Sequence, residues 1–185
     1  PLRNTSSAVE RGNDEDQKIT AISAGKDHTV ALRSDGTVVA WGSNHYGERN
    51  IPADLGSVTA IAAGGFHNLA LCADGTVTAW GGNELGQTDV PAGLNGVKAI
   101  AAGHWHSLAL RHDGTVVAWG MPRFNQNNEG QARVPADLTG VTAIEAGYAH
   151  SLALKDDGSV VAWGGNKGGQ LEVPMREAGV MAISA

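Results

Sequence analysis

Residues 97–120 read VKAIAAGHWHSLALRHDGTVVAWG, and this stretch decides the fold of the chain. Its landmarks are Gly103, His106, an Asp-Gly pair at Asp113 and a Trp-Gly pair at Trp119. The same landmarks recur in the same order in three other places, and the Trp-Gly pairs lie at Trp41, Trp80, Trp119 and Trp163. A period of about 40 residues is typical of a repeat protein. The chain is therefore predicted to contain four copies of one structural unit.

Within this stretch the residue types favour β-structure throughout. Residues 97–102 are short, β-compatible and mostly small, and Gly103 ends them. Residues 106–110 alternate toward Asp113-Gly114, which is a strong hairpin signal, and residues 115–119 are rich in β-formers. No segment has the 3.6-residue apolar period of a helix. Because Pro135 suits an outer edge strand, each copy is predicted to be a four-stranded antiparallel blade of an all-β, β-propeller fold.

The copies divide almost the whole chain. Their predicted bounds are residues 19–57, 58–96, 97–140 and 141–179, and residues 180–185 match the first strand of a fifth copy. Residues 1–17 are polar, match no repeat and form a separate tail. Since Val180–Ala185 duplicates Ile19–Ala24, a ring closed by four blades leaves one of them without a place. We expect a partial ring, completed by further sequence or by another chain.

Composition excludes several classes of function. The formal charge of the 185 residues is -6 and no Lys/Arg cluster occurs, which argues against a nucleic-acid partner. No apolar run reaches the length of a membrane helix, so no membrane insertion is expected. Cys72 is the single cysteine, and an intrachain disulfide is therefore impossible.

Residues present in every copy are predicted to build the blade and to perform no chemistry. The histidines His28, His67, His106 and His150 lie on separate blades, too far apart for one metal ion. Each is expected to orient its own turn by hydrogen bonding, while the Asp-Gly aspartates form turns and the tryptophans fill the blade core. His106-Ser107 has no third group for a catalytic triad, and no phosphate loop occurs. We expect no catalytic residue, no metal and no cofactor.

Residues that differ between copies are the candidates for function. Strand parity places the Gly-x-x-His turns and the loops after Trp-Gly on one face, and aromatic residues recur there. Residue types of this kind are enriched at protein interfaces and their hot spots. The predicted partner-binding residues are Phe66, Trp105, Tyr148, Tyr46, Phe124, Arg123, His104, Lys26 and Asp27. The alternative is that these side chains fill the mouth of a central channel or pack between blades.

The repeated pattern resembles the regulator-of-chromosome-condensation repeat family over residues 18–185. Its form is Ala-Gly-x-x-His-Ser-Leu-Ala-Leu-x-x-Asp-Gly-Thr-Val-Val-Ala-Trp-Gly-x-Asn, and residues 86–92, Gly-Gln-Thr-Asp-Val-Pro-Ala, look like its bacterial branch. That branch includes the propeller-type β-lactamase inhibitory protein. The resemblance implies a β-propeller, usually of seven blades. It also implies that Phe66, Trp105 and Tyr148 match turn positions that contact the partner enzyme in inhibitory relatives.

These observations predict a non-enzymatic binding module that engages a protein through its variable aromatic face, in an inhibitor-like manner. One alternative is a self-assembling structural protein, a homo-oligomer whose subunits complete each other's blades. Another is a glycan-binding propeller, in which the aromatic rings stack on sugars. The resemblance to bacterial relatives favours a secreted, extracellular or cell-surface location. No residue here can be assigned to the nucleotide-exchange activity of eukaryotic relatives.

Overall fold

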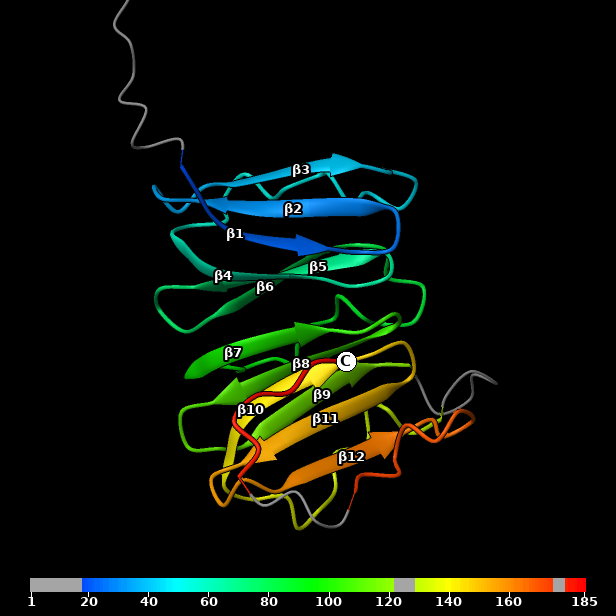
Figure 1. The fold of residues 1–185 in the computed structure, drawn as a ribbon. Coiled ribbons are helices and arrows are strands. Elements are labelled where there is room, and N and C mark those ends of the chain that lie inside the picture. The colour runs from blue at the N-terminus through cyan, green and yellow to red at the C-terminus, as the bar shows by residue number, and fades with distance from the viewer. Residues whose placement is uncertain (1–17, 122–128, 175–178) are drawn as a thin grey trace, which may run out of the picture.

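The computed structural model describes residues 18–121, 129–174 and 179–185, and its regular structure in these ranges is entirely β (Figure 1). Four sheets follow one another along the chain. Blade 1 contains β1 (Ile19–Ala24), β2 (His28–Arg33) and β3 (Val38–Gly42), and blade 2 contains β4 (Val58–Ala63), β5 (His67–Cys72) and β6 (Val77–Gly81). Blade 3 contains β7 (Val97–Ala102), β8 (His106–Arg111) and β9 (Val116–Gly120), and blade 4 contains β10 (Val141–Ala146), β11 (His150–Lys155) and β12 (Val160–Gly164).

Each blade has three strands in antiparallel order, so the prediction of a fourth, outer strand was wrong. The segment after each Trp-Gly pair uses its backbone groups locally. In blade 1, Asn44 Oδ1 accepts the N–H of Arg49 at 2.7 Å, and Glu48 Oε2 accepts the N–H of Tyr46 at 2.9 Å. Because these side chains hold the segment in turns, its peptide groups do not line up for a strand ladder.

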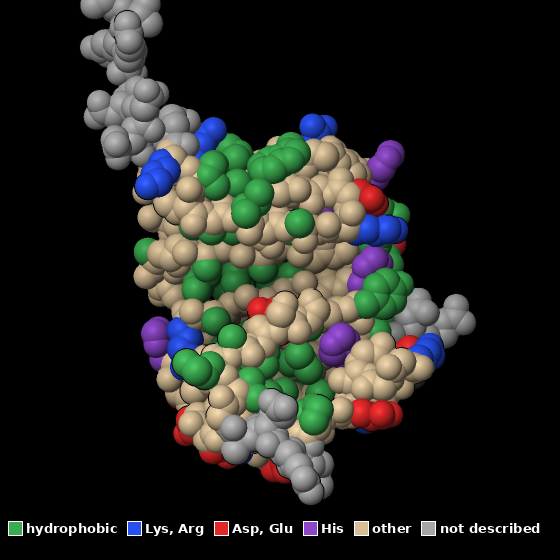
Figure 2. Space-filling model, in the orientation of Figure 1, with side chains coloured by type: hydrophobic (Ala, Val, Ile, Leu, Met, Phe, Trp, Pro, Cys, Tyr) green, Lys and Arg blue, Asp and Glu red, His purple; other side chains and the backbone are tan. Residues whose placement is uncertain are grey.

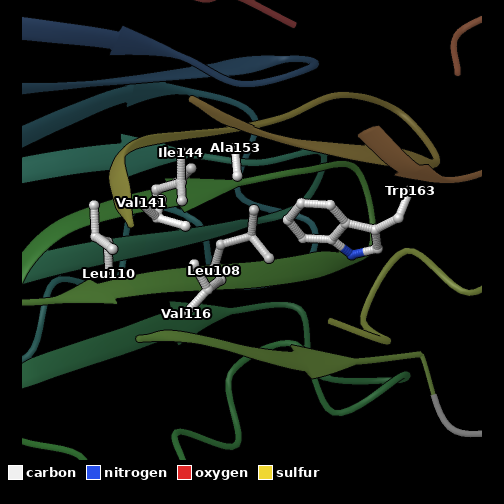
Figure 3. Close-up of a cluster of buried hydrophobic side chains, with 8 residues drawn as sticks. Leu108, Leu110, Val116, Val141, Ile144, Ala153 and Trp163 are labelled. Atoms are coloured by element: carbon white, nitrogen blue, oxygen red, sulfur yellow. The ribbon is translucent and has the colours of Figure 1, made fainter. Parts of the chain in front are cut away.

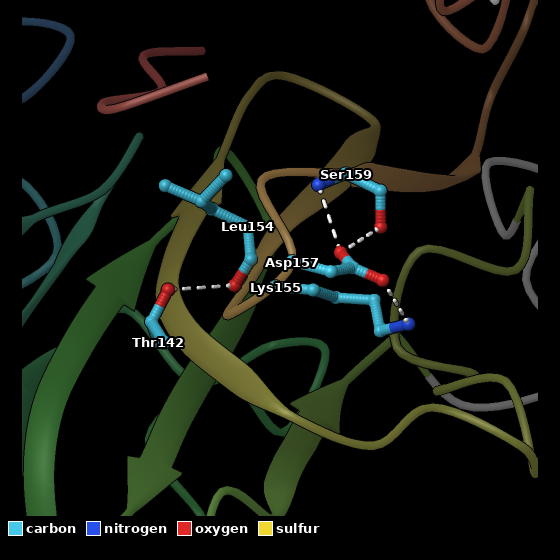
Figure 4. A network of polar contacts seen from close by, with 5 residues as sticks. All are labelled: Thr142, Leu154, Lys155, Asp157 and Ser159. Atoms are coloured by element: carbon cyan, nitrogen blue, oxygen red, sulfur yellow. Dashed lines mark hydrogen bonds and ion pairs between the residues drawn. The ribbon is translucent and has the colours of Figure 1, made fainter. Parts of the chain in front are cut away.

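The inner strands share one irregularity, which a threonine accommodates in three of the four. The register shifts at the second residue of β1, β4, β7 and β10, as at a β-bulge. In β10, the hydroxyl of Thr142 donates to the carbonyl of Leu154 at 3.1 Å (Figure 4). Thr20 and Thr59 make the same bond in their blades. The hydroxyl therefore satisfies a carbonyl beside the irregular step.

The Asp-Gly pairs form the turns between the middle and outer strands, as predicted. Asp157 Oδ1 accepts the N–H of Ser159 at 2.9 Å, and Lys155 Nζ lies 3.3 Å from Asp157 Oδ2 (Figure 4). The hydroxyl and then the N–H of Ser159, followed by the nearby lysine, lower the pKa of Asp157 to about 2. Gly158 has a φ of 78°, a left-handed conformation that glycine adopts without strain. The aspartates are therefore structural turn residues.

The hydrophobic core lies between blades rather than inside any one of them. Between blades 3 and 4, Leu108 and Leu110 of β8 pack against Val141 and Ile144 of β10 and the ring of Trp163 (Figure 3). Equivalent clusters lie between blades 1 and 2 and between blades 2 and 3. Because each sheet buries its side chains against its neighbour, a single blade has no core of its own. Blades of this kind are stable only when stacked.

A buried polar chain crosses each interface beside the apolar cluster. His67 Nε2 of blade 2 lies 2.9 Å from Ser107 Oγ of blade 3. The Ser107 hydroxyl donates to the carbonyl of Gln87 at 2.8 Å, and Trp119 Nε1 donates to the same carbonyl at 2.9 Å. Since the only hydroxyl proton is used on Gln87, His67 donates through Nε2–H. One loop carbonyl thus accepts two donors from the following blade.

The two other interfaces repeat this chain. His28 Nε2 lies 2.8 Å from Asn68 Oδ1, and the carbonyl of Glu48 accepts Asn68 Nδ2 and Trp80 Nε1. The matching groups of the last interface are His106, Ser151, the Gln131 carbonyl and Trp163. For His28, His67 and His106, the prediction that each histidine orients its own turn by hydrogen bonding was therefore wrong. The ring of each of these three reaches the next blade, because a propeller stacks equivalent positions side by side.

The four described blades do not close into a ring. Trp80, Trp119 and Trp163 are 6% exposed, whereas Trp41, against which no described blade packs, is 47% exposed. The prediction of a core role therefore holds for three of the four tryptophans. Residues 180–185 form no assigned strand, in contrast to the predicted fifth first strand. They lie beside β10 in Figure 1, at the place where the next inner strand would run.

No helix in the described ranges is long and apolar enough to cross a membrane.

Burial of the linking histidines predicts a pH-dependent stability. Burial lowers the pKa of His67 to about 3 and that of His106 to about 4. In the unfolded chain the pKa of a histidine is about 6.5. Below pH ~6.5 the unfolded chain therefore binds protons that the folded chain does not. The free energy of unfolding is expected to be highest above that pH and to fall by up to about 1.4 kcal/mol per pH unit for each histidine. Urea unfolding at pH 7, 6 and 5 measures this slope.

The control for this measurement is an exposed histidine. His67→Gln is expected to reduce the pH slope, and His112→Gln is expected to leave it unchanged because His112 is exposed. A free energy of unfolding that is constant from pH 7 to pH 5 would contradict the lowered pKa values of the buried histidines.

Removal of one hydroxyl tests the polar chain directly. Ser107→Ala leaves the buried Nε2–H of His67 without an acceptor and is expected to cost about 1–3 kcal/mol of stability. Ser107→Asn is expected to recover part of this loss, because Asn68 fills the same role in blade 2. Ser57→Ala, at an exposed serine, is the matched control. Equal stability of Ser107→Ala and Ser57→Ala would rule out a stabilising hydrogen bond between His67 and Ser107.

Candidate interaction surface

The Gly-x-x-His turns connect the inner and middle strands and display the variable residues at one end of the blades. In each turn the N–H of the glycine donates to the carbonyl of the histidine, as Gly103 does to His106 at 2.9 Å. The histidine ring folds back over this glycine and leaves no room for a Cβ atom. The two intervening residues are thereby held on a rigid turn and directed outward. The turn geometry is common to all copies, and only the displayed side chains differ.

The first variable position of each turn faces the concave side of the molecule. Lys26, Gly65, His104 and Tyr148 line a cavity of about 400 Å³ together with the last residues of the inner strands. The walls of this cavity are otherwise alanine and glycine. The variable side chains Lys26, His104 and Tyr148 therefore lie at the edge of this cavity.

Aromatic rings from three successive turns and one loop form a continuous cluster on this end. We define the aromatic cluster as Tyr46, Phe66, His104, Trp105 and Tyr148. The ring centroids of Phe66 and Trp105 lie 4.7 Å apart, and those of His104 and Tyr148 lie 4.2 Å apart in a stacked arrangement. Phe66 also contacts Tyr46 at 4.9 Å and His104 at 5.1 Å. In Figure 2, hydrophobic, histidine and charged side chains of both signs lie along the right-hand edge, toward which β1 and β7 run in Figure 1.

The contact between Tyr46 and Phe66 confirms that the turns and the post-Trp loops share one face. Tyr46 belongs to the loop after β3, whereas Phe66 lies in the turn after β4. In three of the four blades a backbone bond also joins the post-Trp loop to the turn of the same blade, as the N–H of Gly82 donates to the carbonyl of Phe66 at 2.8 Å. Loop and turn therefore form one rigid rim.

Two glycines make room for the cluster, and sequence reasoning did not identify them. A Cβ atom on Gly65 would lie 2.6 Å from both Nδ1 and the carbonyl oxygen of His104. A Cβ atom on Gly82 would lie 3.3 Å from the Cβ atoms of Phe66 and Tyr46. The signal available for Gly65 was its departure from the repeat, because the other three turns carry a side chain at that position.

Charge on this surface is modest and placed beside the rings. Lys26 Nζ lies 5.0 Å from the Phe66 ring centroid, a distance at which a cation is attracted to the ring face. Partial burial, and then the positive charge of Lys26, lower the pKa of His104. His104 is therefore neutral at pH 7 and stacks as an aromatic ring. Lys167, by contrast, is paired with Glu129 at 2.6 Å.

The structure brings six of the nine predicted partner-binding residues into one connected group: Lys26, Tyr46, Phe66, His104, Trp105 and Tyr148. Asp27 is exposed in its turn, and its carbonyl accepts the N–H of Ser43 at 2.7 Å. Arg123 and Phe124 lie outside the described residues. Tyr148 is 67% exposed and Tyr46 is 42% exposed, so the two ends of the cluster are available to a partner.

The arrangement of the side chains at this end of the molecule suits the binding of another molecule. The hydroxyls of Ser107 and Ser151 are fully buried and engaged between blades, which makes them inaccessible to a substrate. In the described ranges, no three of the His, Cys, Asp and Glu side chains are grouped so that they could hold a metal ion. What this end of the molecule offers is a shaped apolar surface with an adjacent cation.

One known repeat family matches the chain in four places. Four segments match the Regulator of chromosome condensation (RCC1) repeat: residues 19–48, 58–87, 97–131 and 141–170. No curated protein matches the chain.

Solved structures share the fold over roughly half of their own length. The ectodomain of receptor kinase CR4 from Physcomitrella patens is 25% identical with a TM-score of 0.68, covering 92% of this chain and 46% of that one. The ectodomain of ACR4 from Arabidopsis thaliana is 28% identical with a TM-score of 0.60, covering 80% and 51%. Yeast RCC1 (Prp20), solved bound to Kap60, is 23% identical with a TM-score of 0.66, covering 81% and 44%. The fold is therefore a propeller type, present here as four consecutive blades.

Gly65 provides a test of how the cluster is built. Gly65→Ala places a methyl group against His104 and is expected to destabilise the chain by about 1–3 kcal/mol, the usual cost of overpacking. Gly168→Ala is the control, because its nearest neighbour is the flexible end of Gln170 at 3.3 Å. Thermal unfolding measures the stability, and the His104 and Tyr148 ring resonances report whether their stacking is lost. Unchanged resonances in Gly65→Ala would contradict the packing described.

Proposed function

The chain belongs to the Regulator of chromosome condensation (RCC1) repeat family, and from that premise we propose that it is a non-enzymatic binding module whose aromatic cluster engages a protein partner. The main support for the proposal is that the repeated and the variable positions lie in different parts of the structure. Positions common to the copies form the buried interfaces, while positions that vary form one connected aromatic surface at the turn end.

The composition of the cluster is that of an interface centre. Tryptophan and tyrosine dominate binding hot spots because they bury a large area at low conformational cost. Trp105 and Phe66 are partly buried against each other and are therefore held in place before a partner arrives. Exposed Tyr148 and Tyr46 flank them on both sides. A preorganised surface of this kind loses little entropy on binding.

Lys26 and the open cavity indicate the chemistry of the partner. Lys26 is exposed, and its ammonium group lies beside the Phe66 ring. A partner loop that carries apolar or aromatic side chains and one carboxylate would complement both the rings and the cation. The neighbouring cavity of about 400 Å³ is wide enough to admit such a side chain. We propose an inhibitor-like mode, in which the rim accepts a protruding segment of another protein.

The alternative of glycan binding rests on one feature, the exposed face of Tyr148 stacked on His104. Sugars bind such platforms through their apolar faces. The number and connection of the other rings favour a larger apolar contact, and we therefore rank a protein partner first.

Alanine substitutions identify the face that binds. Trp105→Ala is expected to weaken binding by about 2 kcal/mol or more, the usual scale of a hot spot, and Tyr148→Ala is expected to act in the same direction. His112→Ala, at an exposed residue on the Asp-Gly end, is the matched control. Partners captured by the wild-type chain are quantified against each variant, and dissociation constants are then measured by calorimetry.

A protein that binds wild type and His112→Ala but not Trp105→Ala would support the proposal. Partners whose affinity is unchanged by every substitution in the aromatic cluster would overturn the proposal. Saturable binding on a glycan array, lost in Tyr148→Ala and accompanied by no protein partner, would select the glycan alternative.

A further inference from the structure

The link between blades 2 and 3 contains Asn95-Gly96, the single Asn-Gly pair of the chain. Both residues are exposed, and they lie directly before Val97, the first residue of β7. The matching pairs of two other links are Gly56-Ser57 and Thr139-Gly140, so the asparagine is specific to this copy. A residue that departs from the repeat at an exposed link is a candidate for chemistry that the blade itself does not require.

The hydrogen bonds of the link leave both reacting groups of this pair free. The side chain of Asn95 donates one bond, from Nδ2 to the carbonyl of Gly93 at 3.1 Å. Within the described chain no group accepts the N–H of Gly96. Gly96 has a φ of 61°, and a Cβ atom added to it would meet no atom beyond its chain neighbours within 4 Å. The nitrogen of Gly96 and the amide carbon Cγ of Asn95 therefore have room to approach each other.

The other asparagines of the described ranges lack this combination. Each of them is followed by a residue that has a side chain: Asn44, Asn50, Asn68, Asn83 and Asn166. A side chain on the following residue hinders the approach of its backbone nitrogen, whereas glycine is conformationally free. Asn44 and Asn83 also use both Nδ2 and Oδ1 in hydrogen bonds of their own loops. Asn95 is therefore the described asparagine best placed for attack by the main chain.

We propose that Asn95 is a site of self-modification, at which the link between blades 2 and 3 deamidates through a cyclic imide. Hydroxide takes the proton of the Gly96 nitrogen, which then attacks Cγ of Asn95. The N–Cγ bond forms and the Cγ–Nδ2 bond breaks, and Nδ2 takes a proton from water and leaves as ammonia. A second water molecule opens the imide. Cleavage of the N–Cγ bond gives an aspartyl residue, and cleavage of the bond to the main-chain carbonyl carbon gives an isoaspartyl residue.

The isoaspartyl product changes the main chain at the junction of two blades. Its main chain runs through Cβ and Cγ, which adds one methylene between Leu94 and Gly96. Leu94 and Val97 are both buried in the apolar cluster between blades 2 and 3. The carbonyl of Gly96 accepts the N–H of His112 at 2.9 Å, and the N–H of Val97 donates to the carbonyl of Gly75 at 3.2 Å. Because both sides of the link are held, the added methylene is expected to displace these bonds and to weaken the contact between the blades.

The inference does not depend on the proposed function. A Cβ atom on Gly75, in the Asp-Gly turn of blade 2, would lie 3.4 Å from the Gly96 nitrogen. The link is therefore at the Asp-Gly end, whereas the aromatic cluster lies at the opposite end of the strands. Binding through the cluster and modification of the link can each occur without the other.

Peptide mapping of the aged chain tests the site. The purified chain is incubated at pH 8 and at pH 5 and then digested, and mass spectrometry follows each peptide that contains asparagine. The peptide of Asn95 is expected to gain the mass of a carboxyl group in place of the amide and to separate into aspartyl and isoaspartyl forms. The change is expected to be faster at pH 8, because the attacking nitrogen must lose its proton. The peptides of Asn44 and Asn83 are expected to stay unchanged.

Two variants provide the controls, and thermal unfolding measures the effect on the blade junction. Asn95→Thr copies Thr139 of the next link and is expected to show neither a mass change at the link nor a loss of stability on ageing. Asn95→Asp carries the new charge without the added methylene and is expected to unfold close to the temperature of the fresh wild-type chain. The aged wild-type chain is expected to unfold at a lower temperature, in proportion to its isoaspartyl fraction.

Two results would overturn the inference. One is an intact Asn95 in the folded chain under conditions in which a synthetic peptide of residues 93–98 deamidates, because the fold would then protect the pair. The other is an unfolding temperature that stays constant while the isoaspartyl fraction rises, because the link would then make no contribution to the junction of the blades.

Discussion

One backbone carbonyl at each blade interface is the constraint on which the rest of the structure depends. Glu48, Gln87 and Gln131 lie in the loops that follow the Trp-Gly pairs, fully or almost fully buried, and each carbonyl accepts two donors from the following blade. A buried carbonyl without a partner would be costly, so the loop, the tryptophan and the linking side chain must occur together. This requirement explains why the landmarks recur as a set, and why a blade without a neighbour exposes Trp41 and leaves His150 only partly buried.

The same constraint separates structural from functional positions. The histidine must reach the next blade, and its ring must lie over the glycine of its own turn. The turn conformation is thereby set by contacts that the copies share, while the side chains at its tip differ from copy to copy. Four turns of equal geometry then bring their tips to one end of the molecule, where Phe66, His104 and Trp105 meet. The aromatic cluster is a product of stacking identical turns that carry different side chains.

Much of the fold was predictable because the repeat reports on buried positions. The period and the Asp-Gly hairpins indicated the strands, and the parity of the strands indicated that turns and post-Trp loops share a face. The fourth strand was predicted wrongly, since Pro135 and β-compatible residues also suit a folded loop whose peptide groups are bound by Asn and Gln side chains. The role of the histidines was likewise missed, because a residue that repeats within blades gives no sign of whether its partner is in its own blade or the next.

The sequence by itself determined the all-β repeat, the number of copies and which residues are free to vary. These follow from the secondary-structure propensity of the residues and from the periodicity of the repeat, and both can be read directly from the sequence. Only the tertiary structure decided which variable residues touch. Gly65 and Gly82 leave the space in which His104, Phe66 and Tyr46 pack, and this space exists only once neighbouring blades are stacked. Only the stacking of blades also decided which tryptophans are buried, because the burial of Trp80 and the exposure of Trp41 depend on neighbouring blades and not on the residue type.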